Sequence, residues 1–228
     1  MVIESNAARV MPGVQRTGIR PPKFADKFAA LDFNDGPLPV ISMFEPPMSL
    51  ATEDVEISVR GDDLVTRLVS WHSIDALPRT RIDAELVCQI FNWYEAVRWE
   101  GVRLTDFLDA VDIPASPDGY LVFSSRDGQY FETLSTDEAR DPRVLLATHL
   151  NGEPLPHRYG GPMRLVVPFL QGYKSVKWLG AIHGYRHDPV GIKRLLGQSK
   201  TGRLGQAWLD RLGIAPAAGR PGDPSPSE

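Results

Sequence analysis

A single cysteine and five histidines are the side chains of this chain that could act as soft metal ligands or nucleophiles. The cysteine, Cys88, lies in the apolar run 85–91, where it can be an inert core residue, a nucleophile or a metal ligand. One thiol excludes an internal disulfide and a zinc site built from several cysteines. The histidines are scattered, and Gly184 between His183 and His187 argues against a helical zinc pair.

Composition and missing motifs narrow the function classes further. The sequence contains no GxxxxGK[ST], GxGxxG, GxSxG or HExxH motif. Its net charge of −4 does not indicate a nucleic-acid partner, and no run of about 18 apolar residues predicts a membrane span. Residues 1–21 lack the apolar core of a secretory or twin-arginine leader. We therefore expect a cytoplasmic protein, or a periplasmic one if a leader has been removed.

Four short motifs follow Cys88 in a specific order: WEGV at 99–102, NGEPL at 151–155, GGPMRLVVP at 160–168 and GYKSVKW at 172–178. In order, spacing and residue type they resemble the molybdopterin-binding domain of the sulfite oxidase family, which includes the molybdenum-type methionine sulfoxide reductases. The resemblance extends over residues 52–187.

The resemblance implies a single-domain α+β fold of the sulfite oxidase type, with mixed sheets, short helices and no C-terminal immunoglobulin-like dimerisation domain. It implies a molybdenum–molybdopterin cofactor and transfer of one oxygen atom to or from a small-molecule substrate. There is no CxxCH haem motif, so a separate electron-transfer protein is the expected partner. We expect the domain over 39–213, between an irregular N-terminal arm (1–38) and a disordered tail (214–228).

The resemblance also assigns site residues. Cys88 becomes the molybdenum ligand, and Tyr130 a hydrogen-bonding group on the substrate side. Arginine and lysine are charge-assisted donors that suit the anionic pterin phosphate. The expected cofactor-binding residues are Asn92, Tyr159, Arg164, Lys174, Ser175 and Lys177.

Each of these assignments has a structural alternative. Arg164 could form an internal ion pair, Lys174 and Lys177 could be solvated, and Cys88 could be core packing. Three glycines of the motifs are expected to let the backbone approach the cofactor. These are Gly160, Gly161 and Gly172.

The expected substrate follows from residues that are missing. Sulfite-oxidising members carry an arginine four or five residues after the cysteine, where this chain has Asn92 and Trp93. The segment 41–44 (ISMF) also lacks the arginine, asparagine and histidine found there in the family. We therefore expect a neutral sulfoxide or N-oxide rather than sulfite. A non-catalytic cofactor-binding or scaffold relative, and a thiol enzyme using Cys88 as nucleophile, remain alternatives.

The elements that must position these residues are mostly short strands. Alternating or continuous apolar runs predict strands at 55–59, 64–69, 85–91, 120–124, 129–134, 144–150, 163–168 and 175–182. Helical spacing or capping predicts helices at 73–77, 104–111, 135–138, 192–196 and 204–212. Strands without regular βαβ alternation favour an α+β fold over a doubly wound one.

Overall fold

The computed structural model describes residues 28–33, 36–89, 91, 93–113, 119–217 and 219. Its strands are β1 (Ala30–Asp32), β2 (Val40–Ser42), β3 (Glu56–Arg60), β4 (Thr66–Ser70), β5 (Arg79–Cys88), β6 (Trp93–Arg103), β7 (Tyr120–Ser125), β8 (Phe131–Ser135), β9 (Leu145–Leu150), β10 (Glu153–Pro154), β11 (Arg164–Val166) and β12 (Leu179–Tyr185). The α-helices are α1 (Trp71–Asp75), α2 (Leu104–Ala110), α3 (Thr136–Ala139) and α4 (Gln206–Leu212). Four 3₁₀ turns, at 52–54, 157–159, 172–174 and 192–196, complete the described elements.

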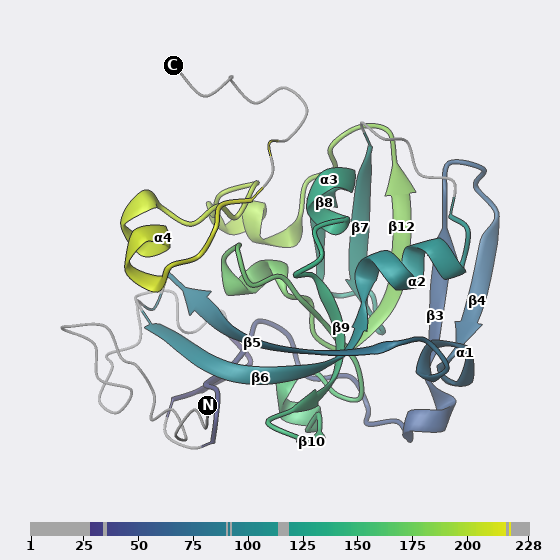
Figure 1. Cartoon of the computed structure of the whole chain (residues 1–228), viewed down its shortest axis with the longest axis horizontal. Coiled ribbons are helices and arrows are strands. Elements are labelled where there is room, and N and C mark those ends of the chain that lie inside the picture. Colours follow the sequence, from purple (N-terminus) through teal and green to yellow (C-terminus); the bar gives the residue numbers. More distant parts are fainter. Residues whose placement is uncertain are drawn as a thin grey trace.

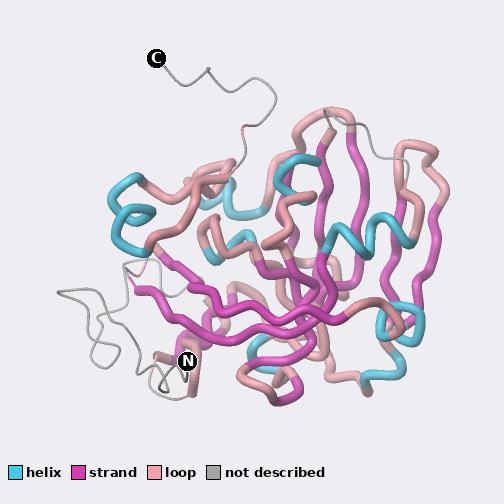
Figure 2. Tube along the Cα trace, in the orientation of Figure 1, coloured by secondary structure: helices cyan, strands magenta, loops and turns pink. Residues whose placement is uncertain are grey.

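Two five-stranded sheets carry the fold (Figure 1). One has the order β10-β9-β6-β5, with β11 also paired to β9, and the other has the order β4-β3-β12-β7-β8. The pairs are antiparallel except β3 with β12, which is parallel. Figure 2 shows the long β5–β6 hairpin running across the direction of the strands of the second sheet. The predicted α+β class, with mixed sheets and short helices, is confirmed.

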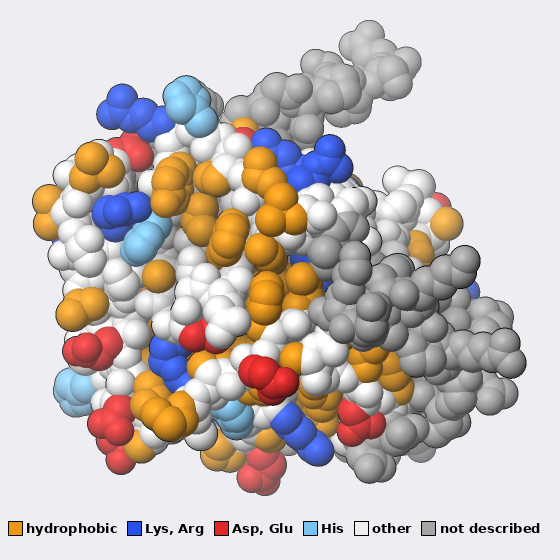
Figure 3. Space-filling view, turned by 180° about the vertical axis from the view of Figure 1, so that it is seen from behind, with side chains coloured by type: hydrophobic (Ala, Val, Ile, Leu, Met, Phe, Trp, Pro, Cys, Tyr) orange, Lys and Arg blue, Asp and Glu red, His pale blue; other side chains and the backbone are white. Residues whose placement is uncertain are grey.

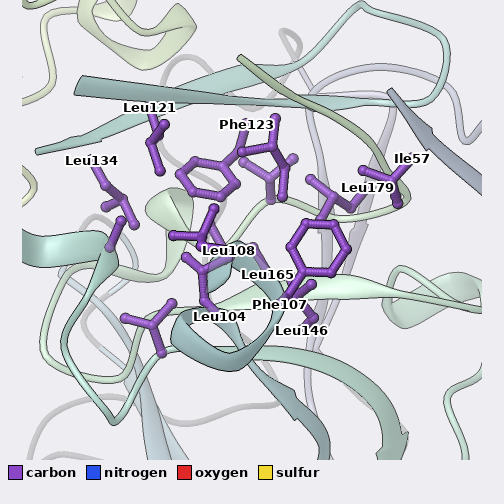
Figure 4. Close-up of a cluster of buried hydrophobic side chains, with 14 of the residues drawn as sticks. Ile57, Leu104, Phe107, Leu108, Leu121, Phe123, Leu134, Leu146, Leu165 and Leu179 are labelled. Atoms are coloured by element: carbon purple, nitrogen blue, oxygen red, sulfur yellow. The ribbon is translucent and has the colours of Figure 1, made fainter. Parts of the chain in front are cut away.

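Helix α2 fills the space between the two sheets. Its Leu104, Phe107 and Leu108 are almost completely buried, as their i, i+3, i+4 spacing predicts. They pack with inward side chains of both sheets, including Phe123 of β7 and Leu165 of β11 (Figure 4). This cluster fixes the second sheet against the first, on which the cysteine and the arginine motif lie.

Sheet β10-β9-β6-β5 is buried on its other face too. Trp93 and Trp99 of β6 belong to a second apolar cluster, with Leu155 and the partly buried Cys88. The described part of the expected arm, residues 28–33 and 36–38, contributes Phe33 and Leu38 to this cluster. Strand β1 of this segment pairs with β2. The remainder of the arm lies outside the described residues.

Most predicted elements are found within a few residues of their predicted bounds, and the capping box of Ser135 with Glu138 is present. The strand expected at 85–91 is longer, beginning at Arg79, because β6 offers it ten pairing partners. The strand expected at 175–182 begins only at Leu179, since Trp178 has a positive φ of 49° that an extended strand cannot contain. The segment 192–196 is a 3₁₀ turn rather than an α-helix.

Strand β6, eleven residues long, was not predicted from the sequence as a strand. Its register against β9 shifts between Glu100 and Gly101. A Cβ on Gly101 would lie 2.0 Å from the carbonyl oxygen of Leu146, so only glycine allows β9 this close. The glycine of the WEGV motif therefore serves sheet packing.

The chain end beyond α4 is held against the domain as far as it is described. Ile214 packs on the core, and the guanidinium of Arg143 donates to the carbonyl oxygens of Ala215 and Pro216. The rest of the tail, residue 218 and residues 220–228, lies outside the described residues. On the face drawn in Figure 3, hydrophobic side chains gather in a central band, with charged ones mostly around it. None of the helices among the described residues is long and apolar enough to cross a membrane.

Candidate active site

A cavity with about 940 Å³ of empty space, part of it open to solvent, lies where the two sheets and the N-terminal segment meet. One side, which we call the motif wall, consists of Arg164, residues 171–173, Ser175 and residues 177–178. The other side, the distal wall, consists of Phe28, residues 38–39, residues 41–45 and Lys193. The ends of β5 and β6 and the β7–β8 hairpin close the remaining sides.

Cys88 is the last residue of β5 and lines this cavity. It is half-buried and is paired in register with Trp93, which lines the cavity as well. Trp93 is 5% exposed, and its indole nitrogen has no hydrogen-bond partner among the described residues. The only thiol of the chain thus lies at a cavity wall, where a ligand can reach it.

Arg164 is 2% exposed and lines the motif wall. Its guanidinium donates to the carbonyl oxygens of Tyr159 and Ser175, both at 2.8 Å, and lies 5.3 Å from the ring of Trp99. Burial lowers the pKa of Arg164 to about 10, so the group is still charged at neutral pH. Arg164 forms no ion pair with a carboxylate among the described residues, which argues against the structural alternative that the sequence left open for it.

Lys177 lines the same wall. Its ammonium donates to the carbonyl oxygen of Ile41 at 2.9 Å and to that of Arg158 at 3.4 Å. Burial, with repulsion from Arg164, lowers its pKa to about 7. A nearby anion would restore the charged form, so this lysine suits an anionic ligand.

Lys174 has a different environment from the one expected. It is fully buried, does not line the cavity, and forms an ion pair with Glu132 at 2.9 Å. Its ammonium also donates to the carbonyl oxygen of Thr133 at 3.0 Å. The structure therefore gives this lysine an internal partner, and neither the cofactor contact nor the solvated alternative describes its position.

Tyr130, in the connection between β7 and β8, lines the same cavity as Cys88. Its hydroxyl donates to the carbonyl oxygen of Tyr173 at 2.7 Å. Burial first, and then the negative charge of Glu132, raise the pKa of Tyr130 well above its usual value. The phenol stays protonated, and because its one proton is engaged, it can accept from a ligand but has no proton free to donate.

Of the three remaining residues that were expected to bind the cofactor, one lines the cavity, one does not, and one is not described. Ser175 lines the cavity, and its hydroxyl accepts from the backbone N–H of Val167 at 3.0 Å. Tyr159 is buried against Gly36 and does not line the cavity, although its hydroxyl has no hydrogen-bond partner in the described part of the chain. Asn92 lies outside the described residues.

The glycines of the motifs are required for two different structural reasons. A Cβ on Gly161 would lie 1.9 Å from the carbonyl oxygen of Leu155, and one on Gly160 would meet Lys177 at 2.8 Å. Close packing within the protein explains these two, contrary to the expectation of a cofactor contact. Gly172 does line the cavity, so the expectation is compatible with its position.

Sequence analysis identified segment 41–44 of the distal wall but missed the rest of it. Lys193 and Phe28 come from parts of the chain with no motif, far from Cys88 in sequence. No periodicity or spacing pattern distinguishes Lys193 from its exposed neighbour Arg194. The wall is otherwise apolar or neutral between Leu38 and Phe44, and Glu45 ends it.

The chemistry of this arrangement is that of a binding site for a bulky anion with a soft metal. Three cationic side chains line the cavity, Arg164, Lys177 and Lys193, against the carboxylates Glu45 and Asp127. No group of three or more histidine, cysteine, aspartate or glutamate side chains that could hold a metal occurs among the described residues. A metal here would depend on the thiolate of Cys88 together with ligands that it brings with it.

The comparison with protein families matches residues 44–192 to a model described as "Oxidoreductase molybdopterin binding domain". Among curated relatives, the chain is 38% identical over 99 residues to the protein-methionine-sulfoxide reductase catalytic subunit MsrP of Xanthomonas axonopodis pv. citri. That alignment covers 37% of this chain and 30% of the relative. Mitochondrial sulfite oxidase of Drosophila melanogaster is 27% identical over 174 residues, covering 65% of this chain and 29% of the relative. The chain thus aligns with about a third of each of these proteins.

A solved structure shares the fold. It is the sulfane dehydrogenase SoxCD from Paracoccus pantotrophus, with a TM-score of 0.55 and 21% sequence identity. The match covers 64% of this chain and 41% of that one.

Proposed function

The chain belongs to the sulfite oxidase family of molybdopterin-binding oxidoreductase domains, and we propose that it transfers an oxygen atom to or from a small neutral sulfoxide or N-oxide. The observation that supports this substrate class is the distal wall. The segment 41–44, where the family carries polar and basic side chains, lines the cavity with Ile41, Ser42, Met43 and Phe44. A sulfite anion would need several cationic donors at such a wall.

The cavity fits the family's cofactor on its chemistry. Cys88 offers the soft sulfur ligand that suits molybdenum. Arg164, which is buried, and Lys177, which is half-buried, have no carboxylate partner in the described residues, as an anionic phosphate requires. The unpartnered indole nitrogen of Trp93 is a further buried donor that a ligand could satisfy. When bound, the cofactor supplies a metal that exchanges two electrons and one oxygen atom with a substrate.

The motif wall is suited to holding the phosphate end. The guanidinium of Arg164 donates to three backbone carbonyls, including that of Leu165 at 3.4 Å, so its remaining N–H groups have a set direction. Lys177 is fixed in the same way by the carbonyl oxygen of Ile41. Because these carbonyls are backbone atoms, binding requires little reorganisation of the wall.

Tyr130 and the distal wall would contact the substrate. The protonated phenol of Tyr130 donates its proton to Tyr173, so its oxygen can accept a hydrogen bond from a water beside the substrate but cannot donate to the substrate's oxygen. The aliphatic and aromatic side chains around it exclude water from the cavity. In the reducing direction, a sulfoxide, two electrons and two protons give a sulfide and water, and a separate electron-transfer protein would supply the electrons.

The experiment has two stages. Protein expressed with molybdate is first analysed for molybdenum and for pterin, and about one of each per chain is expected. Steady-state turnover is then measured with a reduced viologen dye and dimethyl sulfoxide, methionine sulfoxide or trimethylamine N-oxide, and in parallel with sulfite and a dye acceptor. Turnover of an S-oxide or N-oxide with sulfite inactive is the expected result.

Two results contradict the proposal in different ways. Sulfite oxidation with a Michaelis constant in the low micromolar range would overturn the substrate class while leaving the enzyme class intact. A full complement of cofactor without turnover of any of these substrates would favour the non-catalytic cofactor-binding relative.

A further inference from the structure

The turn at 192–196 is attached to the second sheet by one carboxylate. Oε1 of Glu132, on β8, accepts from the backbone N–H of Lys193 at 2.9 Å. A Cβ on Gly191 would lie 2.3 Å from the same carboxylate, so glycine is required for this approach. Oε2 of Glu132 is paired with Lys174, which fixes the carboxylate from the other side. The backbone of Lys193 is thus held at a definite place beside the cavity.

The side chain of Lys193 is buried and lines the cavity. Its ammonium lies 4.6 Å from the ring centre of Phe28, another lining residue. Burial lowers its pKa to about 8, while negative charge on Cys88 and Glu132 favours the charged form. The ammonium thus lies in the same cavity that Cys88 lines.

Three buried or half-buried lysines can be compared. The ammonium of Lys174 has a carboxylate and a carbonyl as partners, and that of Lys177 has two carbonyls. Among the described residues, the ammonium of Lys193 has no hydrogen-bond acceptor and no ion pair, only the ring of Phe28. This ammonium lies at the wall of a cavity that is partly open to solvent, so its N–H groups are available to water or to a ligand, and an acceptor on a ligand would form a charge-assisted hydrogen bond with it.

We propose that the Lys193 ammonium binds the oxygen atom of the substrate, as hydrogen-bond donor to a dipolar S–O or N–O group held beside Cys88. The inference rests on the proposed function and deepens it. Such oxides are neutral overall but carry most of their negative charge on oxygen, so one cationic donor in an apolar wall suits them better than a cluster of arginines. Tyr130 cannot serve in this way, because its proton is donated to Tyr173.

The test uses the holoenzyme in its oxidised state, which has no electrons to reduce a sulfoxide. Calorimetry then gives the dissociation constant of dimethyl sulfoxide without turnover. Lys193→Met should weaken binding by about tenfold to a hundredfold, the range for a hydrogen bond to a charged group. Lys193→Arg should restore part of the affinity. Arg194→Met, which removes the exposed neighbouring charge, is the matched control and should bind like the parent protein.

Cofactor content separates a substrate contact from a pterin contact. Molybdenum and pterin per chain should be unchanged in Lys193→Met, and the Michaelis constant for the sulfoxide should rise more than the turnover number falls. Loss of pterin from this variant would assign the ammonium to the cofactor and overturn the inference. Unchanged affinity with unchanged cofactor would reduce Lys193 to packing and also overturn it.

Failure of the proposed function would be recognised separately. If the parent holoenzyme binds neither sulfoxide nor N-oxide, the same calorimetry is done with sulfite. Sulfite binding that is lost in Lys193→Met but kept in Arg194→Met would retain Lys193 as the oxygen-binding donor. Equal sulfite titrations in all proteins would overturn that assignment as well.

Discussion

The motif wall and the distal wall of the cavity differ in how their cations are satisfied. On the motif wall, Arg164 donates to the backbone carbonyls of Tyr159 and Ser175, and Lys177 donates to the carbonyl oxygen of Ile41 in the distal wall, so both have acceptors within the protein. On the distal wall, Lys193 has an aromatic ring as its contact and no acceptor among the described residues. The cations of the motif wall are therefore preorganised by the protein, whereas the distal wall retains one donor for a ligand.

Cys88 lines the same cavity, and its loss should have the largest effect. Cys88→Ser replaces the soft sulfur with a hard oxygen donor, so turnover should fall to background. The visible absorption of the bound metal should change at the same time. A thiol nucleophile without a metal would lose activity without any spectral change, and that result would contradict the ligand role.

Glu132 connects the two walls through Lys174 and Lys193. Glu132→Leu leaves the ammonium of Lys174 buried without its counter-ion, and the free energy of unfolding should fall by about 3–5 kcal/mol. The double variant Glu132→Leu/Lys174→Met should recover most of the loss, with the bond to the Lys193 backbone still missing. Denaturant unfolding measures both.

A surface ion pair is the control for this prediction. Arg98 and Asp83 are about half exposed, and Asp83→Asn should cost less than about 1 kcal/mol. A Glu132→Leu variant as stable as Asp83→Asn would show that the buried pair does not join the walls.

Gly191→Ala should displace the distal wall alone. The new Cβ would meet the carboxylate of Glu132, and the resulting overpacking should cost about 1–3 kcal/mol and move Lys193. Binding of dimethyl sulfoxide should weaken while pterin content is kept. Gly205→Ala is matched, because its backbone is similarly extended and its Cβ would meet nothing nearer than 3.8 Å. If both variants bind alike, the position of the turn does not matter to the substrate.

The pH dependence of stability should report on the motif wall. Burial lowers the pKa of Lys177 to about 7 from an ordinary 10.5. Between these values the unfolded chain holds a proton that the folded cofactor-free protein has lost, so its stability should rise from pH 7 towards pH 10. Lys177→Met should flatten this rise in part, since Lys193 shifts the same way. Parallel curves for parent and variant would contradict the buried position of Lys177.

Sequence patterns predicted the elements whose signal is local. The stripe Leu104, Phe107, Leu108 gave α2, and Ser135 with Glu138 gave the capped start of α3, because both depend on neighbours within one or two turns. Strand β6 was not predicted, because its extended conformation depends on pairing with β5 and β9, which are distant in sequence or depend on it in turn. The order of motifs likewise predicted the family and led to Cys88, Tyr130, Arg164, Ser175 and Lys177, all of which line one cavity.

The fold class, the family and most of the motif wall could be predicted from the sequence, because these follow from local patterns and from motifs contiguous along the chain. The tertiary structure decided the partners of the charges. It paired Lys174 with Glu132 away from the cavity and brought Lys193, from the turn after β12, to the cavity that Cys88 also lines. The reason is physical: whether a lysine is paired, solvated or left as a donor depends on contacts between segments distant in sequence, which no spacing of residues encodes.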